Sequence, residues 1–314
     1  MIRNILFNNK NINNIKKFRG FCSLSEKYGG KPVDLVFNVQ KPSHLKPTDN
    51  QNVKNIIILH GLFGAGGNWK TISPKIADNT NCNVFQVDQR NHGISPHTNE
   101  FNYKVMSDDI GRLIEKENLN DVSIIGHSMG GRVAMLYALL YPETINKLVI
   151  VDISPSHLKS HTIMEFREYL ERMDSMDVKN LKNRKEAEDW LAPVVPERGV
   201  RLFLLTNLIL GDNGHYHWRI NIKGLLEKID NVASFPTPTE ISEMSTSKTN
   251  KYTRPTLFIA GGKSHFIRDQ DTQLINSYFP NYELEVVPNA GHWVHAEDPK
   301  TFVQIVSDFI NKDN

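Results

Sequence analysis

Ser128 stands in the motif G-H-S-M-G of residues 126–130, in which a serine has a glycine two positions away on either side. The apolar run Val122 to Ile125 predicts a buried strand before the motif, and Arg132 to Leu140 predicts a helix after it. A turn of this kind exposes the hydroxyl at a helix N-terminus, where the dipole and a free N–H favour negative charge. This pattern is typical of a serine nucleophile. A phosphate-binding loop is the alternative, but the G-x-G-x-x-G and Walker spacings are both missing.

A second glycine-rich loop begins His60-Gly61 and directly follows another predicted strand. Attack by a serine on an acyl carbonyl creates an oxyanion, which backbone N–H groups can stabilise. We expect one donor to be Met129, which follows the serine, and the second to be Leu62 or Phe63 in this loop. Alone, the loop could be an ordinary turn, and only its combination with the serine motif indicates a site.

Seven short β-branched runs alternate with helical sequence and predict the strands that must position these residues. Several of the runs lack polar alternation, which is typical of parallel strands buried on both faces. The sequence therefore predicts an α/β fold with a mostly parallel central sheet flanked by helices. The expected strands lie at 33–39, 56–59, 84–87, 122–125, 148–151, 256–259 and 284–287.

The alternation lapses between about residues 155 and 251, where charged helical sequence appears instead. We expect residues 26–155 and 251–314 to form one core and residues 156–250 to form an inserted helical cap. Its apolar residues could line a channel for an acyl chain or could simply pack the cap on the core. They are Met164, Met173, Met176, Trp190, Leu202 to Leu205, Leu208 to Leu210 and Trp218.

Taken together, the motifs after residue 25 resemble the α/β-hydrolase family, and thus imply an α/β-hydrolase fold. The resemblance rests on the His60-Gly61 loop, DQRNHGIS at 88–95, the serine motif at 126–130 and NAGHWVHAEDP at 289–299. The segments VDISP at 151–155 and GGKS at 261–264 are similar to those of a branch of small acyl esterases, which comprises bacterial enzymes and mitochondrial relatives.

The resemblance also implies a base and an acid, because a serine hydroxyl needs a histidine to accept its proton and a carboxylate to orient that histidine. His292, in the loop after the last predicted strand, fits the family order of serine, acid and histidine. Many members carry the acid where this chain has Ser264. The similar esterases have it at Asp152, which could otherwise cap the segment that begins at Ser154. Asp269 is the alternative acid.

Other charged and imidazole side chains near these motifs are expected to be structural. We interpret His295 as a packing residue. His60 and His127 are expected to shape the oxyanion hole formed by the backbone N–H groups. Asp88 and Arg90 are expected to fix the conformation of their own loop. No metal-ligand spacing emerges, and no metal or cofactor is implied.

The family resemblance implies hydrolysis of an acyl or lipid ester, or of a thioester, through an acyl-enzyme. Serine at position 128 disfavours the branches that attack with a carboxylate, which include epoxide hydrolases and dehalogenases. A carbon–carbon bond hydrolase with the same triad is one alternative, and a protective, protein-binding role on the same fold is another. The sequence indicates no particular protein partner.

The first 25 residues contain five cations and no Asp or Glu, with apolar residues at roughly helical spacing. This pattern predicts a mitochondrial transit peptide, cleaved near Ser23, and a matrix location; a solvated tail is the alternative. Because the whole chain has a net charge of +2, the remaining residues carry −3, and a nucleic-acid partner is not expected. Cys22 and Cys82 suggest no disulfide framework, and no apolar run is long enough to span a bilayer.

Overall fold

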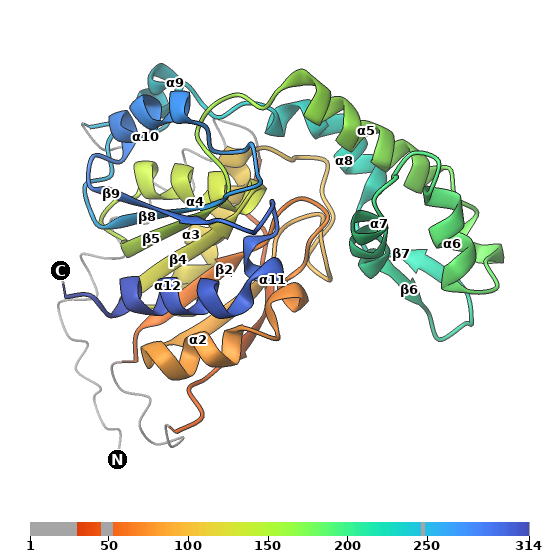
Figure 1. Cartoon of the computed structure of the whole chain (residues 1–314), viewed down its shortest axis with the longest axis horizontal. Coiled ribbons are helices and arrows are strands. Elements are labelled where there is room, and N and C mark those ends of the chain that lie inside the picture. The colour runs from red at the N-terminus through yellow and green to blue at the C-terminus, as the bar shows by residue number, and fades with distance from the viewer. Residues whose placement is uncertain (1–29, 45–52, 246–248, 314) are drawn as a thin grey trace, which may run out of the picture.

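The computed structural model describes residues 30–44, 53–245 and 249–313, so the predicted leader lies outside the described residues. Figure 1 shows a central sheet. The order of its strands is β1-β3-β2-β4-β5-β8-β9. All neighbouring strands are parallel except β1 and β3. The mostly parallel sheet is therefore confirmed, and each predicted strand is present. The strands are β1 (Val36–Gln40), β2 (Asn55–Leu59), β3 (Asn83–Asp88), β4 (Val122–His127), β5 (Ile145–Val151), β8 (Thr256–Gly261) and β9 (Tyr282–Val287).

The unbroken apolar run of β2 is explained by burial on both faces of the sheet. Ile56 and Ile58 pack in one hydrophobic cluster, whereas Ile57 and Leu59 pack in the other. Successive side chains of a strand point to opposite faces, so a strand covered on both sides must be apolar at every position.

Helices cover both faces of this sheet (Figure 1). Helices α2 and α12 contact each other and contribute to the cluster around Ile56, whereas α3 and α4 contribute to the cluster around Ile57. In the described ranges, no helix is long and apolar enough to cross a membrane. The core helices are α2 (Ser73–Thr80), α3 (Tyr103–Lys116), α4 (Met129–Leu140), α10 (Thr272–Tyr278), α11 (Val294–Glu297) and α12 (Pro299–Asn311).

The stretch 156–250 is hereafter called the inserted segment. In its described residues it contains the α-helices α5 (Ser160–Asp174), α6 (Arg184–Leu191), α7 (Arg198–Leu204), α8 (Ile222–Lys228) and α9 (Pro238–Met244). It also contains a hairpin of β6 (Leu208–Leu210) and β7 (Tyr216–Trp218), which the sequence analysis did not predict within the mainly helical segment. The turn G-D-N-G at 211–214 joins two apolar runs and allows them to pair.

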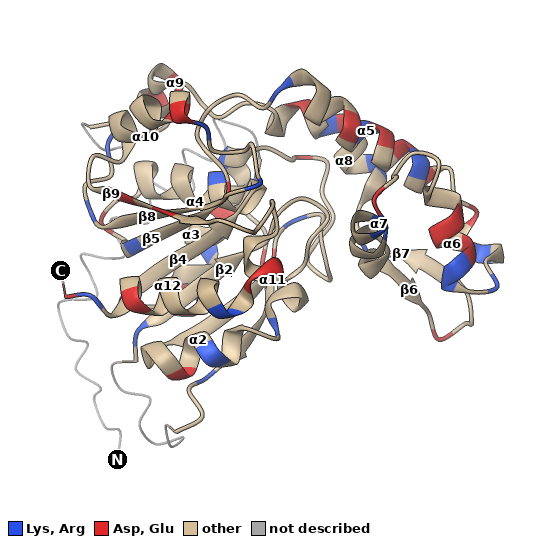
Figure 2. Cartoon of the chain, in the orientation of Figure 1, with Lys and Arg blue, Asp and Glu red and all other residues tan. Residues whose placement is uncertain are grey.

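Figure 1 shows α5 to α8 and the hairpin as a lobe beside the sheet, whereas α9 lies next to α10 over the core. In agreement with this view, α9 contacts α4. Figure 2 shows charges of both signs along α5 and α6, as expected for solvated helix faces.

One buried guanidinium joins the two ends of the lobe. Arg132, on α4, donates to the carbonyl oxygen of Ser154 at 3.2 Å and also to that of Ser156, where the chain leaves the core. It donates as well to the carbonyls of Val232 and Ala233, at 3.2 and 3.1 Å, where the chain returns. Both connections are therefore fixed to the helix that follows Ser128.

Candidate active site

Ser128 lies at the sharp turn between β4 and α4, with φ of 53° and ψ of −119°. This is a positive-φ conformation that non-glycine residues rarely adopt. The flanking glycines are required by close backbone contacts. A Cβ at Gly126 would lie 2.4 Å from the carbonyl oxygen of Gly130, and one at Gly130 would lie 2.5 Å from that of His60. The spacing of the motif thus reflects the packing of the turn.

The structure brings Ser128, His292 and Asp152 together from three different strand ends. The serine Oγ lies 3.0 Å from His292 Nε2, and His292 Nδ1 lies 2.7 Å from Asp152 Oδ2. Asp269 is exposed in the 3₁₀ turn Asp269–Asp271, and no contact links it with His292. Because Asp152 and Ser128 occupy both ring nitrogens, the histidine has no nitrogen left for the alternative acid.

The carboxylate of Asp152 is fully buried and receives several hydrogen bonds. Its Oδ1 accepts from the Gly261 N–H at 2.9 Å, and its Oδ2 accepts from the Ser264 hydroxyl in addition to His292. Ser264, at the position where the family resemblance led us to look for an acid, therefore supports the carboxylate supplied by the preceding strand. The sequence motif reveals this position but not its supporting role.

His292 is itself held by its neighbours. Phe266 stacks on its ring, with centroids 3.9 Å apart and planes inclined by 23°. His127 Nε2–H donates to the His292 backbone carbonyl at 2.8 Å. Burial lowers the pKa of His127 well below its usual value, so this ring is a neutral donor at physiological pH. His127 thus supports the backbone of His292, and its role in shaping the oxyanion hole stays a prediction.

The two candidate donors in the glycine-rich loop differ in their hydrogen bonding. The N–H of Phe63 donates to His92 Nε2 at 3.3 Å and is therefore already engaged. Among the described residues, the N–H of Leu62 has no acceptor. Met129 is the first residue of α4, so its N–H has no partner within that helix. Leu62 and Met129 thus have N–H groups available for an oxyanion.

Residues 54–299 match the family described as alpha/beta hydrolase fold. The chain belongs to this family. It is 37% identical over 282 residues to the sn-1-specific diacylglycerol lipase ABHD11 of Mus musculus, covering 89% of this chain and 86% of the relative. It is 34% identical over 299 residues to a probable alcohol acetyltransferase of Saccharomyces cerevisiae, covering 90% and 84%. A solved marine microorganism esterase, 34% identical, superposes with a TM-score of 0.79, covering 88% of this chain and 99% of that one.

In this α/β-hydrolase, His60 and His92 are neutral residues that fix the glycine-rich loop. His60 Nδ1–H donates to the Gly61 carbonyl at 2.8 Å, and its Nε2 accepts from the Gln89 N–H at 3.0 Å. His92 donates from Nδ1 to the Arg90 carbonyl at 2.9 Å. Burial lowers the pKa of His60 to about 4 and that of His92 to about 3. His92 lies in the motif at 88–95, but only its contacts reveal that it supports the site.

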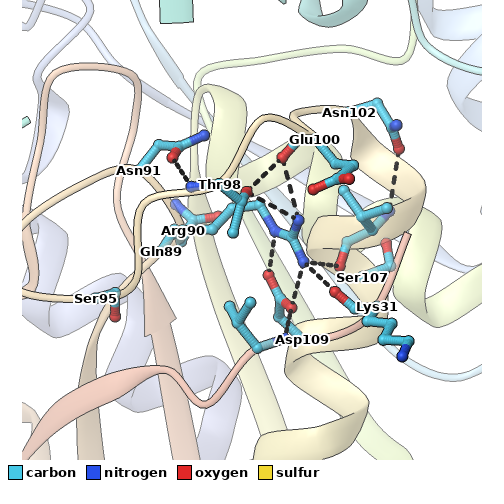
Figure 3. Close-up of polar contacts among 12 residues, drawn as sticks. Lys31, Gln89, Arg90, Asn91, Ser95, Thr98, Glu100, Asn102, Ser107 and Asp109 are labelled. Atoms are coloured by element: carbon cyan, nitrogen blue, oxygen red, sulfur yellow. Dashed lines mark hydrogen bonds and ion pairs between the residues drawn. The ribbon is translucent and has the colours of Figure 1, made fainter. Parts of the chain in front are cut away.

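The loop that carries His92 is anchored by the buried side chain of Arg90 (Figure 3). Arg90 Nε and Nη2 donate to the two carboxylate oxygens of Asp109 at 2.6 and 2.7 Å. Its Nη1 donates to the Glu100 carbonyl at 3.1 Å, and Nη2 donates to that of Lys31 at 3.2 Å. This network supports the structural role that we expected for Arg90.

A cavity of about 340 Å³ opens above the triad of this hydrolase. Ser128 and His292 line it together with side chains of the inserted segment. Phe166, on α5, and Phe203, on α7, are among the apolar ones. Exposed Lys159 and other polar side chains also line the cavity. The cavity can therefore receive a molecule with both an apolar and a polar part.

Proposed function

We propose that this protein hydrolyses carboxylic esters of acyl or lipid type through a covalent acyl-enzyme on Ser128. The observation that carries the proposal is the continuous chain of hydrogen bonds from Ser128 through His292 to Asp152, at the wall of a cavity. Nucleophile, base and orienting acid lie in the order that this chemistry requires. The relatives named as lipase and esterase support the same reaction class.

In the proposed reaction, His292 Nε2 accepts the Ser128 proton while Oγ attacks the ester carbonyl carbon. The N–H groups of Leu62 and Met129 stabilise the resulting oxyanion. His292 then gives the proton to the leaving alcohol, and the acyl group stays on Oγ. Water attacks the acyl-enzyme with His292 again acting as base, which releases the acid and restores Ser128. Asp152 keeps the Nδ1–H tautomer and stabilises the imidazolium.

We further propose that the acyl chain lies against the apolar side chains contributed by the inserted segment. Phe166, Val200 and Phe203 line the cavity and suit a hydrocarbon chain. The mouse relative is named as a diacylglycerol lipase, which supports a lipid ester as the substrate. A series of p-nitrophenyl esters with acyl chains of increasing length tests this part, and a larger kcat/KM for longer chains is expected.

The mechanism is tested by fluorophosphonate labelling and ester hydrolysis with the purified protein. Ser128→Ala should abolish labelling, and His292→Ala and Asp152→Asn should lower kcat/KM by about 10³-fold or more. Asp269→Asn is the matched control and should stay within about twofold of wild type. The proposal is wrong if folded wild-type protein neither labels nor hydrolyses any ester.

Two further assays separate ester hydrolysis from acyl transfer to an alcohol and from carbon–carbon bond cleavage. Because the yeast relative is named as a probable alcohol acetyltransferase, the first assay adds ethanol during hydrolysis of an acetyl ester and analyses the products. Ethyl acetate as the main product would indicate that an alcohol resolves the acyl-enzyme in place of water. Labelling without turnover of esters, together with cleavage of diketones, would favour a carbon–carbon bond hydrolase.

A further inference from the structure

The glycine-rich loop that begins at His60 and carries Leu62 is hereafter called the oxyanion loop. Its conformation depends on contacts with residues far away in the sequence. Phe63 is buried and has φ of 64°, a left-handed conformation that bulky residues rarely adopt. Such conformations persist only where surrounding groups impose them. The peptide groups next to Phe63 should therefore have strong partners.

One of these partners comes from the inserted segment, 144 positions along the chain. The side-chain Nδ2 of Asn207 donates to the Phe63 carbonyl at 2.7 Å and to the Leu204 carbonyl at 3.2 Å. Both neighbours are acceptors, so the amide nitrogen must face them. Asn207 is fully buried, and its own backbone carbonyl accepts from the Arg219 N–H at 2.9 Å. The residue is thus held in one orientation.

This hydrogen bond continues through the loop to the candidate oxyanion donor. The peptide group that contains the Phe63 carbonyl also contains the Gly64 N–H, which donates to the Gly61 carbonyl at 3.0 Å. The peptide group that contains the Gly61 carbonyl in turn contains the Leu62 N–H. Hydrogen bonds in such a series orient and polarise one another. Asn207 is therefore connected to the Leu62 N–H through two peptide groups.

We propose that Asn207 is a positioning residue for the oxyanion hole, so that the inserted segment completes the catalytic site as well as lining the cavity. The inference rests on the proposed esterase function. Asn207 ends the 3₁₀ turn Leu205–Asn207 that directly follows α7, whose Phe203 and Leu204 line the cavity. The part of the inserted segment that contacts the acyl chain is thus the part that orients the Leu62 N–H.

The variant Asn207→Leu tests this role because it keeps the side-chain size and removes the donor. Asn231→Leu is the control, since the exposed Asn231 of the inserted segment also donates from Nδ2 to a core carbonyl, that of Phe101 at 3.1 Å, which lies outside the oxyanion loop. With p-nitrophenyl acetate, Asn207→Leu should lower kcat about tenfold with KM within about twofold of wild type. Asn231→Leu should leave kcat within about twofold, and Asn207→Gln, which keeps an amide donor, should recover part of the loss.

Binding of a trifluoromethyl ketone distinguishes a positioning role of Asn207 from a general effect of its substitution on the structure. Ser128 Oγ adds to the ketone carbonyl, its proton passes to His292, and the hemiketal oxyanion occupies the oxyanion hole. Asn207→Leu should weaken binding of the ketone by the same factor as it lowers kcat/KM, because both report stabilisation of the oxyanion. Equal kcat and ketone affinity in folded Asn207→Leu and wild type would overturn the inference and leave the esterase proposal intact.

A measurement on the wild-type protein keeps the inference testable if Asn207→Leu fails to fold. In amide NMR spectra, formation of the ketone adduct should shift the Leu62 and Gly64 N–H signals and the Asn207 side-chain signals, but not those of Asn231. An unchanged Asn207 signal in the adduct would contradict the inference. Absence of both ester hydrolysis and ketone binding in the wild type would instead refute the proposed function, and the inference with it.

Discussion

At the residue scale, Asp152 is held in place by further hydrogen bonds besides the one with His292. Asp152 has φ of 49°, and its buried carboxylate accepts from the Gly261 N–H and the Ser264 hydroxyl. These hydrogen bonds fix the position of the carboxylate that orients His292 and stabilises the imidazolium. Ser264 thus supports the site without touching the reacting atoms.

Ser264→Ala should therefore lower kcat without abolishing activity. Loss of one hydrogen bond to a charged group corresponds to about 1.5 kcal/mol, or roughly a tenfold decrease in kcat. Steady-state hydrolysis of a p-nitrophenyl ester measures the effect. Ser277→Ala, which removes an exposed hydroxyl bonded to the Leu274 carbonyl, is the control and should leave kcat unchanged. Equal kcat values for the two variants would argue against support by Ser264.

The glycines give a second prediction at this scale. Gly130→Ala should destabilise the fold by about 3 kcal/mol, because its Cβ would lie 2.5 Å from a backbone oxygen that cannot move freely. A Cβ added at Gly199, in α7, would point into open space, so Gly199→Ala should stabilise the protein by about 0.5–1 kcal/mol. Urea unfolding measures the free energy of unfolding of both variants. A change of the same sign in the two variants would contradict the close packing at Gly130.

At the element scale, the loop after β3 is a rigid support for the oxyanion loop. Asp88 accepts from the Gly66 N–H at 2.7 Å and from the Ile94 N–H at 2.9 Å, and so joins the two loops. The buried pair of Arg90 and Asp109 fixes the same loop to α3 (Figure 3). The conformation of the oxyanion loop is therefore fixed by contacts with a second loop, which does not line the cavity.

Removal of one member of this buried pair should be severe. Arg90→Met leaves the Asp109 carboxylate buried without its cation, and we expect a loss of about 3–5 kcal/mol of unfolding free energy. The double variant Arg90→Met/Asp109→Leu should be more stable than the single one, because no buried charge remains. Arg112→Ala breaks an exposed pair with Asp34 and should change stability by less than about 1 kcal/mol. Denaturant titrations compare the three, and a double variant less stable than Arg90→Met would contradict this explanation.

The elements that the sequence reveals are those with a local signal. The strands follow from apolar runs, and the turn at Ser128 follows from its glycines, because each is determined by neighbouring residues. The choice of Asp152 over Asp269 depended on a family resemblance, since loop paths are set by tertiary contacts. Asn207 could not be found in this way, because its partner Phe63 lies 144 positions away. The β6–β7 hairpin has a local signal as well, in the turn sequence G-D-N-G at 211–214.

At the scale of the whole molecule, four buried histidines link stability to pH. Burial lowers the pKa of His60 to about 4, that of His92 and His295 to about 3, and that of His127 well below its usual value. Unfolding exposes each ring, whose pKa then returns to about 6.5. Below pH 6.5 the unfolded state therefore binds protons that the folded state does not.

The protein should accordingly be at full stability above about pH 6.5 and should lose stability as the pH falls from about 6.5 toward 4. Each histidine contributes up to about 1.4 kcal/mol per pH unit in this window. Urea unfolding at pH 7.5, 6.0 and 5.0 measures the slope. His295→Gln removes one of the titrating groups and should reduce it. A stability that does not change between pH 7.5 and 5.0 would be inconsistent with neutral buried rings.

The N-terminal leader gives a prediction about the location of the whole protein. Residues 1–25 fused to a fluorescent protein should direct it to mitochondria, because the segment has five cations and no acidic residue. Replacement of all five cations by Gln should abolish the mitochondrial localisation. The residues to be replaced are Arg3, Lys10, Lys16, Lys17 and Arg19. Import that is unaffected by loss of these charges, or a diffuse signal with the native leader, would support a solvated tail instead. Microscopy and protease protection measure the outcome.

The bonds of Arg132 bear on how this architecture can diversify. Because they hold the departing and returning backbone beside one another, the chain enters and leaves the lobe at one place on the core. A lobe of another length or shape can be grafted at that place without moving the strand ends that carry Ser128, Asp152 and His292. On the proposed role of Asn207, the graft would keep the full catalytic rate only if it also brought a donor to the Phe63 carbonyl. New specificities could thus arise by exchange of one contiguous stretch of gene, subject to that one constraint.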